Sequence, residues 1–393
     1  MAGSLVHLGA GVVCAGCGCL CDDIQPDGTN LCELGRRYWQ QLPAVETMSF
    51  VQEQPVSVDQ SIEAAVAMLR EAKAPGILGL NLISCEACEA AVKLAQQLNC
   101  WLSPWPADPL RFWGHSAPDL ALSRAEMQSG ADLVIYLGFP DGVDAVQPRH
   151  RERHLARGLG IDRAQLHLPW NGADGLARTL ELRLHLERDE PASPEVMEIA
   201  SAIKNAKCIQ VYALAQLAQY SPSLITHWQA LAAKQRGQRR MGVALLGSTG
   251  KARTVTETMT WLTGYPGPVK FTNGAPAYLP NIGEVDALLK RKACDVVLWV
   301  GQHQPEALAR EDHAMMSVFR VDSLREPPSL ARRAAIVGRI GMEVHWQLPG
   351  LHPQLDAHVI RGDTVMLRLA GSGPGIPDPM EILLHRLREE LAR

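Results

Sequence analysis

The chain has 393 residues, which is more than one compact hydrophobic core normally takes, so two or three domains are expected. With 47% hydrophobic and 20% charged residues it has the composition of a soluble globular protein, and its net charge of −4 argues against a general nucleic-acid or membrane surface. No apolar run reaches the roughly 18 residues of a transmembrane helix, and the first residues lack the basic and apolar regions of a secretion signal, so a cytoplasmic protein is expected.

The first predicted element is a small cysteine-rich module over residues 1–45. Five of the ten cysteines lie within the first 32 residues. Four of them have a spacing that lets thiolates from one tight loop and its return converge on a [4Fe–4S] cluster; they are Cys14, Cys17, Cys21 and Cys32. Cys19 is then spare, and Gly16 and Gly18 give the loop its backbone freedom. The module is too small for a core of its own and needs a metal or a neighbouring domain to hold its shape.

Three other interpretations of these cysteines stay open. A tetrahedral zinc site could use the same four residues, although the usual pattern has two C-x2-C pairs and the second pair is missing here. Disulfides are disfavoured because the cysteines are too close in sequence to pair comfortably. A vestigial loop could keep its shape and no longer carry metal.

Beyond the module, short apolar strands alternate with amphipathic helices. A helix is expected to start near Ser57, followed by a strand over 75–80, a helix over 86–98 and strands over 132–138 and 164–168. Continuous apolar strands separated by helices of ten to fifteen residues are typical of a parallel sheet that is covered on both faces. A doubly wound α/β domain is therefore predicted.

The same alternation resumes after the Pro-containing stretch 189–194, which reads as a linker. Strands are expected over 208–212, 242–247 and 295–301, a helix over 224–233, and a capped helix over 377–391. The sequence thus predicts a first α/β domain over 46–190, completed by 335–393, and a second α/β domain over 191–334. Three strands end in glycine at the sheet edge where ligands of such folds usually bind, at Gly138, Gly247 and Gly301.

Smaller signals have weaker interpretations. Cys85 and Cys88 resemble a redox pair, but two small buried residues at the start of a helix explain them better. The basic segment 147–154 is either a solvated helix start or a surface for an anionic ligand or partner. Segments 260–268 and 273–276 contain too much Gly and Pro for the interior of an element, which predicts a long structured loop of the kind that is often functional.

Four separate motifs together resemble a known family. They are the Cys14-x2-Cys17-x3-Cys21-Asp22-Asp23-Ile24 loop with Cys32, Ser84-Cys85-Glu86, Trp261-Leu262-Thr263-Gly264-Tyr265-Pro266 with Asn273-Gly274-Ala275-Pro276, and Pro349-Gly350 with Arg361-Gly362-Asp363. From about residue 12 to the end, the chain resembles the B subunit of formylmethanofuran dehydrogenase. The resemblance implies a molybdopterin oxidoreductase-like fold, with Cys14, Cys17, Cys21 and Cys32 as cluster ligands and a tungsten or molybdenum bis-pterin between two α/β domains.

One feature of the active family members is missing here. They carry a Cys or selenocysteine on the metal, and the matching region 101–118 contains no cysteine, its nearest remnant being Trp113-Gly114-His115-Ser116. A histidine replaces a soft thiolate in neither charge nor donor type. We therefore expect molybdopterin or tungstopterin to be absent, and with it metal catalysis by this chain.

A related bacterial assembly offers a role without that chemistry. In the formyltransferase/hydrolase complex of methylotrophic bacteria, a subunit similar to this one serves as a scaffold while other subunits act on the formyl carrier. The resemblance thus implies a largely non-catalytic subunit in one-carbon metabolism. Its expected partners are other subunits of the complex, and binding to nucleic acid or to a membrane is not expected. An active pterin oxidoreductase and a small-molecule sensor with an empty pterin pocket are the alternatives.

Overall fold

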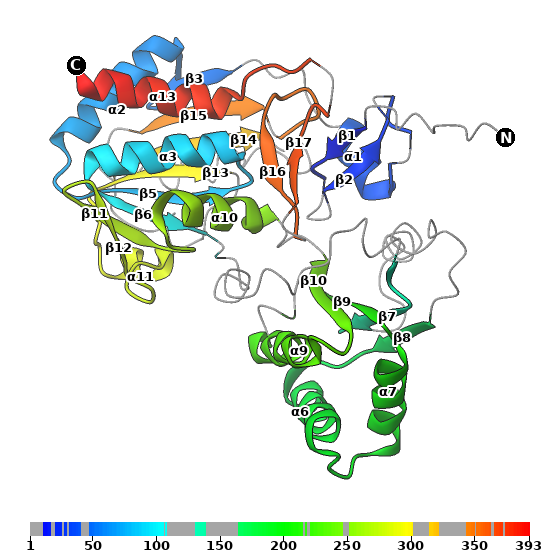
Figure 1. Cartoon of the computed structure of the whole chain (residues 1–393). Helices are drawn as coiled ribbons and strands as arrows, with labels where there is room; N and C mark the ends of the chain where they lie inside the picture. Colours follow the sequence, from blue (N-terminus) through cyan, green and yellow to red (C-terminus); the bar gives the residue numbers. More distant parts are fainter. Residues whose placement is uncertain are drawn as a thin grey trace.

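The fold is described from a computed structural model of the chain. It describes residues 11–16, 20–25, 27–29, 31–40, 47–105, 107, 130–138, 164–214, 217, 221–246, 251–301, 314–321, 343–349, 351–362, 365–371 and 374–393. Figure 1 shows a larger body built on one wide sheet, a smaller lobe built on a second sheet, and the N-terminal module beside both. In the described residues, no helix is long and apolar enough to cross a membrane.

The larger body is built on a nine-stranded sheet. Its strands are, in spatial order, β12 (Ala275–Tyr278), β11 (Val269–Thr272), β6 (Trp101–Pro104), β5 (Pro75–Asn81), β13 (Val296–Gly301), β14 (Ala314–Val321), β15 (Val344–Pro349), β3 (Met48–Val51) and β4 (Gln54–Val56). The five central strands, β6 to β15, are parallel, and the outer ones are antiparallel. Such a run of buried parallel strands is what the continuous apolar segments predict.

Helices cover one face of this sheet, as Figure 1 shows: α2 (Val58–Glu71), α3 (Cys85–Leu98), α10 (Lys251–Thr263) and α13 (Pro379–Ala392). Alternate residues of β13 divide between the two faces: Leu298 packs under these helices, whereas Trp299 packs toward α11 (Val285–Lys290) on the other face. The starts of α3 and α13 are tied together, because the Ser84 hydroxyl donates to Asp378 Oδ2 over 2.5 Å while each side chain also caps its own helix.

The smaller lobe contains a four-stranded parallel sheet. Its strands are, in order, β10 (Arg240–Leu246), β9 (Cys208–Leu214), β7 (Leu133–Leu137) and β8 (Ala164–Leu168). Three helices pack on one face: α6 (Gly172–Arg188), α7 (Pro194–Asn205) and α9 (Pro222–Gln235). Among the described residues, the opposite face is covered by the cysteine module rather than by helices. A strand that is buried on both faces is continuously apolar whatever covers it, so the sequence could not distinguish this arrangement from a doubly wound one.

The module itself is an antiparallel ribbon of β1 (Val12–Cys14) and β2 (Cys21–Ile24), followed by α1 (Glu33–Gln40). A second ribbon, β16 (His358–Ile360) with β17 (Met366–Arg368), lies next to it. The α/β fold with parallel sheets and an N-terminal cysteine module is thereby confirmed.

Strand pairing differs from the predicted domain boundary at residue 190. β7 and β8 lie before that position, but β7 pairs with β9, which lies after it, so all four strands share one sheet with β10; likewise β13 pairs with β5. The stretch 189–193 only connects α6 to α7, which pack on the same sheet. Alternating strands and helices predict parallel sheets, but the pattern does not show which strands pair. The sequence therefore does not show that the strands of one sheet are inserted in the chain between strands of the other.

The segments predicted as one long loop are also more regular than expected. Helix α10 runs to Thr263, and β11 and β12 form a hairpin closed by Asn273 and Gly274, whose φ angles are +49° and +75°. An Asn-Gly pair with two positive φ angles suits a two-residue hairpin turn. Pro276 is tolerated in β12 because β12 is the edge of the sheet.

Candidate functional site

Three of the four predicted ligand cysteines lie in the ribbon module. Cys14 and Cys21 face each other as Cα partners in the β1–β2 ladder, and Cys32 lies one residue before α1. All three are buried. Cys17 and Cys19 lie outside the described residues. Three of the four thiols therefore lie in the N-terminal module, while their role as ligands and the position of Cys17 stay predictions.

Gly35 lies against both sides of this group. Its N–H donates to Cys32 Sγ over 3.4 Å, and a Cβ at this position would come within 3.3 Å of Cys14 Sγ and 2.9 Å of Leu31 Cδ2. Glycine is thus needed here for close approach, and its amide belongs to the first turn of α1, where backbone N–H groups favour a thiolate. Sequence reasoning gave a role only to the loop glycines Gly16 and Gly18 and missed Gly35, whose only signal was a glycine three residues after Cys32.

The two faces of the ribbon pack against different parts of the protein. Val12 and Cys14 belong to a cluster with Tyr136 and Tyr212 of the four-stranded sheet. Val13 and Ala15 point the other way, into a cluster with residues around the β16–β17 ribbon. This alternation follows from the two-residue repeat of a strand. The module therefore lies between the smaller lobe and the larger body and packs against both.

Rings stack on the sheet face that receives the cysteines. The Tyr136 ring lies 5.0 Å from the His167 ring at an interplanar angle of 13°, and 5.9 Å from the Tyr212 ring at 24°. Tyr136 is fully buried. Cys14 and Cys21 belong to the same buried cluster as Tyr136 and Tyr212, so these rings help to exclude water from the two thiols.

Polar contacts fix the module to the C-terminal segment. The Val13 N–H donates to the Leu369 carbonyl over 3.1 Å, and the Tyr38 hydroxyl donates to the Leu351 carbonyl. Arg361, which is buried, lies with Nη1 3.0 Å from Asp22 Oδ2. The first and last parts of the chain are therefore joined at the module by buried hydrogen bonds and an ion pair, which are costly to leave unsatisfied.

The donor set of the module suits an iron–sulfur cluster in type: soft thiols, a backbone N–H aimed at sulfur and an apolar surround. The arrangement of ligands for a metal is not seen among the described residues, because they contain no group of three or more His, Cys, Asp or Glu side chains placed to hold a metal ion. The four-cysteine ligand set therefore remains a proposal.

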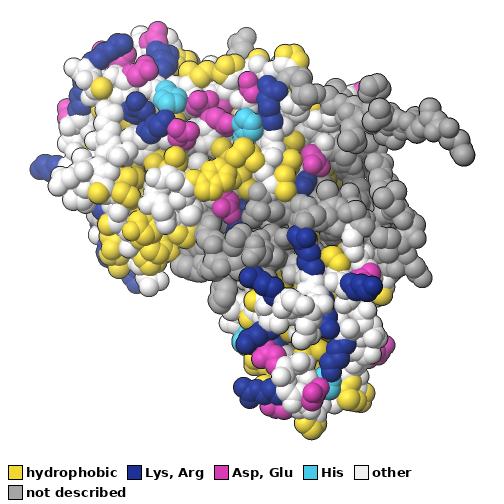
Figure 2. Space-filling view, viewed as in Figure 1, with side chains coloured by type: hydrophobic (Ala, Val, Ile, Leu, Met, Phe, Trp, Pro, Cys, Tyr) yellow, Lys and Arg dark blue, Asp and Glu magenta, His cyan; other side chains and the backbone are white. Residues whose placement is uncertain are grey.

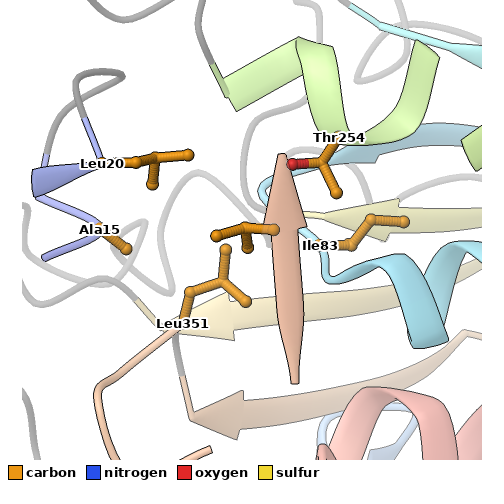
Figure 3. A pocket seen from close by; sticks show the side chains of 6 residues that line it. Ala15, Leu20, Ile83, Thr254 and Leu351 are labelled. Atoms are coloured by element: carbon orange, nitrogen blue, oxygen red, sulfur yellow. The ribbon is translucent and has the colours of Figure 1, made fainter. Parts of the chain in front are cut away.

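A small cavity lies where the module meets the larger body. Figure 3 shows Ala15 and Leu20 on one side, facing Ile83 and Thr254 on the other, with Leu351 below; Val359 completes the lining. Its volume is about 10 Å³, room for about one water and far too little for a pterin. The Thr254 hydroxyl is engaged, because it accepts the Ile360 N–H over 2.9 Å.

A second notable region is the carboxyl end of β5 and β13. Strand order reverses here, since β6 follows β5 on one side and β13 lies on the other, and such switch points are where open α/β sheets bind ligands. The backbone is strained: Leu80 and Leu82 have φ angles of +56° and +55°. Gly301, at +124°, leaves no room for a Cβ beside Asn81.

The predicted sheet-edge glycines agree with this geometry as far as they are described. Gly138 follows β7 with a φ of +77° and Gly301 ends β13, while Gly247 lies outside the described residues. So do the basic segment 147–154 and most of the region 101–118, of which 101–105 and 107 are described. No ligand role is tested at these positions.

Cys85 and Cys88 are buried, as the sequence predicts, and so are Cys100 and Cys294. Burial raises the pKa of Cys85 to about 11 and that of Cys100 to about 12, and it raises the pKa of Cys88 as well. Neutral, buried thiols of this kind are poor nucleophiles and poor ligands. The Cys85–Cys88 spacing is thus not a reactive dithiol site.

Known proteins are similar to this chain over most of its length. No family model matches the chain. It is 22% identical over 452 aligned residues to the B subunit of the tungsten-containing formylmethanofuran dehydrogenase 2 of Methanocaldococcus jannaschii, covering 98% of this chain and all of that one.

Among solved structures, a chain of the formyltransferase/hydrolase complex of Methylorubrum extorquens, solved with methylofuran, superposes with a TM-score of 0.66. The match covers 88% of this chain and 98% of that one at 18% sequence identity, which establishes a shared fold. Sequence and fold together confirm the similarity to the B subunit of formylmethanofuran dehydrogenase that the motifs predict.

Proposed function

We propose that this chain is a largely non-catalytic scaffold subunit of a formyltransferase/hydrolase-type complex, which handles formyl groups on a methanofuran-type carrier during formaldehyde oxidation. The observation that carries the proposal is similarity along nearly the whole chain to the B subunit of a formylmethanofuran dehydrogenase, combined with a sequence that has no cysteine between Cys100 and Cys208. The stretch aligned with the metal-binding loop of active relatives therefore has no thiolate to offer.

The architecture supports a scaffold role. The module's ribbon is buried on both faces, between the four-stranded sheet and the segment 351–369, and it is tied to that segment by Val13 and Tyr38. The ribbon thus connects the two lobes. In a complex, these lobes are surfaces on which enzyme subunits can be held.

The test is elemental analysis of the complex purified with its partner subunits. Less than about a tenth of an atom of tungsten or molybdenum per chain, together with formyl transfer and hydrolysis by the partners, is expected. About one atom of either metal per chain would overturn the proposal. Failure of the chain to co-purify with any partner would do so as well, because a scaffold subunit has no function alone.

An active pterin oxidoreductase is the second candidate. The strained backbone at Leu80 and Leu82, at the switch point of the larger sheet, is the observation that favours it, because strain of this kind often accompanies a ligand site. This candidate requires a pterin in the purified complex and reduction of an artificial dye that depends on the formylated carrier. A pterin-free complex without dye reduction rules it out.

Within the scaffold, we assign Cys14, Cys17, Cys21 and Cys32 to a [4Fe–4S] cluster with a structural role. The Gly35 amide that donates to Cys32 Sγ supports the assignment, since amide donors to sulfur stabilise such clusters. Iron and acid-labile sulfide on anaerobically purified complex should each be about four per chain. A colourless, iron-free protein with an intact fold would instead establish the loop as a vestige.

A further inference from the structure

The smaller lobe contains a long stretch of chain with positive charge only. Residues 199–256 include no Asp or Glu, whereas the whole chain has a net charge of −4. The basic residues of this stretch are Lys204, Lys207, Lys234, Arg236, Arg239, Arg240, Lys251 and Arg253. Figure 2 shows Lys and Arg side chains spread over the visible face of the smaller lobe.

The fold gathers six of these residues at one edge of the four-stranded sheet. Helices α7 and α9 end there, and strands β9 and β10 begin there. We call this surface the basic edge; it consists of Lys204, Lys207, Lys234, Arg236, Arg239 and Arg240. Five of its members are exposed and Arg239 is half-buried.

Backbone contacts hold the basic edge in a defined shape. The Arg240 N–H donates to the Lys207 carbonyl over 2.9 Å, so these two residues are neighbours on adjacent strands. Arg239 donates through Nη2 to the Lys204 carbonyl over 3.4 Å and through Nη1 to Gln235 Oε1. The charges are thus mounted on rigid elements, which favours specific recognition over loose attraction.

Two acidic side chains lie close to Lys204 and Lys207. Asp132 accepts the N–H groups of Lys207 and Cys208, both over 2.9 Å, and so acts as a cap for the start of β9. Asp189 lies 3.4 Å from the Lys204 ammonium, but its side chain is 88% exposed, so the pair is well screened by water.

Helix dipoles explain only part of the pattern. Lys204 and Lys234 lie in the last turns of α7 and α9, where a positive charge offsets the negative end of the dipole. Lys207, Arg239 and Arg240 lie beyond the helix ends, where that benefit is lost. Their presence, without acidic neighbours in the sequence, needs another reason.

We propose that the basic edge binds an acidic segment of a partner polypeptide chain, an inference that rests on the proposed role as a complex subunit. A polypeptide fits better than a nucleic acid because the chain as a whole is negative and the stretches 201–210 and 234–242 contain no aromatic residue on which a base could stack. Interspersed carboxylates on a flexible or helical segment match the exposed ammonium groups of Lys204, Lys207 and Lys234 along one sheet edge.

The first test is zero-length crosslinking of the intact complex with a carbodiimide, which joins lysine amines to carboxylates in direct contact. Crosslinked peptides that pair Lys204, Lys207 or Lys234 with Asp or Glu of another subunit are expected. Crosslinks between subunits that all lie elsewhere on this chain would overturn the inference.

The second test compares two charge-reversed variants. Lys207→Glu with Lys234→Glu alters the basic edge, whereas Lys73→Glu with Lys290→Glu makes the same charge change at exposed positions of the larger body, with one site of each pair in the last turn of a helix. The first variant should hold its partner subunits at least about tenfold more weakly at 150 mM salt, and the second should match the wild type. Equal melting temperatures of the two isolated variants confirm that folding is intact.

The outcomes separate this inference from the proposed function. If the wild-type chain binds its partners and both variants do so equally well, the basic edge is not the docking site, while the scaffold role stands. If the wild-type chain has no partners, the proposed function itself fails. If nuclease treatment releases the bound material, the edge binds nucleic acid and the inference is wrong.

Discussion

The described thiols of the N-terminal module and the thiols of Cys85 and Cys88 lie in different environments. Cys14 lies on a strand facing Cys21, next to a glycine whose amide donates to Cys32 Sγ. Cys85 and Cys88 lie in the first turn of α3, in the apolar core of the larger body, where burial raises both pKa values. Spacing decides whether sulfurs can reach a common point; the surrounding dipoles decide whether they can carry charge there.

Removing one thiol from each group tests most directly whether the two groups differ in metal binding. Cys21→Ala should abolish bound iron, because a cluster that loses one of four thiolate ligands is not retained. Cys88→Ala should keep the full iron content and lose about 1 kcal/mol of stability from the small cavity. Iron analysis of the anaerobic complexes checks both. Equal iron content in both variants would show that the module thiols are no more ligands than the core thiols.

The anchoring of the module can be tested at Gly371. It has a φ of +57°, and a Cβ there would lie 2.1 Å from the Gly11 carbonyl oxygen. Gly371→Ala should lower the free energy of unfolding by about 3 kcal/mol, the sum of backbone strain and displacement of the module.

Gly264→Ala is the matched control for this backbone strain. Its φ is +82° and nothing lies within 4 Å of the position that a Cβ would take, so the loss should be only about 1 kcal/mol. Chemical denaturation of the two variants measures the difference. Equal losses would mean that contact with the module contributes nothing at this point.

Tyr38→Phe should have a smaller effect of the same kind. It removes the hydroxyl that donates to the Leu351 carbonyl and leaves that buried oxygen without this donor, at a cost of about 1–2 kcal/mol. Cluster content should persist, because Tyr38 supports the module and is not a ligand. Denaturant unfolding followed at the cluster absorbance measures stability and cluster retention together. Loss of iron from the variant under native conditions would contradict the role of Tyr38 as a support that is not a ligand.

The core thiols should give the smallest effect, a loss of stability in alkali. Burial holds the pKa of Cys100 at about 12 and that of Cys294 at about 11, above the ordinary value of 9.0 for a thiol. The unfolded chain therefore releases protons first, and stability that is complete below pH 9 is lost as pH rises through the folded pKa values.

Unfolding at pH 8 and pH 10 measures this slope. Each thiol should contribute at most about 1 kcal/mol per pH unit. The double variant Cys100→Ala with Cys294→Ala should have a shallower slope than the wild type. An unchanged slope would show that these thiols titrate normally and that the core does not differ from a solvated environment.

Local patterns predicted much of this fold and less of the site. Apolar runs such as the one in β13 and the capping signals around Ser57 predicted strands and helices close to their observed bounds, because periodicity and caps act within a few residues. Pairing of β13 with β5 joins residues more than two hundred positions apart, and nothing local encodes it.

The same limit applies to the site. The spacing of the thiols singled out Cys14, Cys21 and Cys32 as candidate ligands. The sequence pattern did not predict the groups that surround them in the fold, which are the Gly35 amide, the Tyr136 ring and the Leu369 carbonyl. The strain at Leu80 and Leu82 also escaped prediction, since leucine is a residue type that rarely adopts positive φ. Sites assembled from distant segments are thus visible in sequence only through their ligands.

The hydrogen bond from Val13 to the Leu369 carbonyl has a consequence for synthesis on the ribosome. The ribbon of β1 and β2 is translated before the segment 351–369 on which it packs. Until then, its cysteines stand outside their final packing and the thiols are open to solvent and to metal donors. Residues 12–15 therefore cannot complete their packing until residues 351–369 have been made.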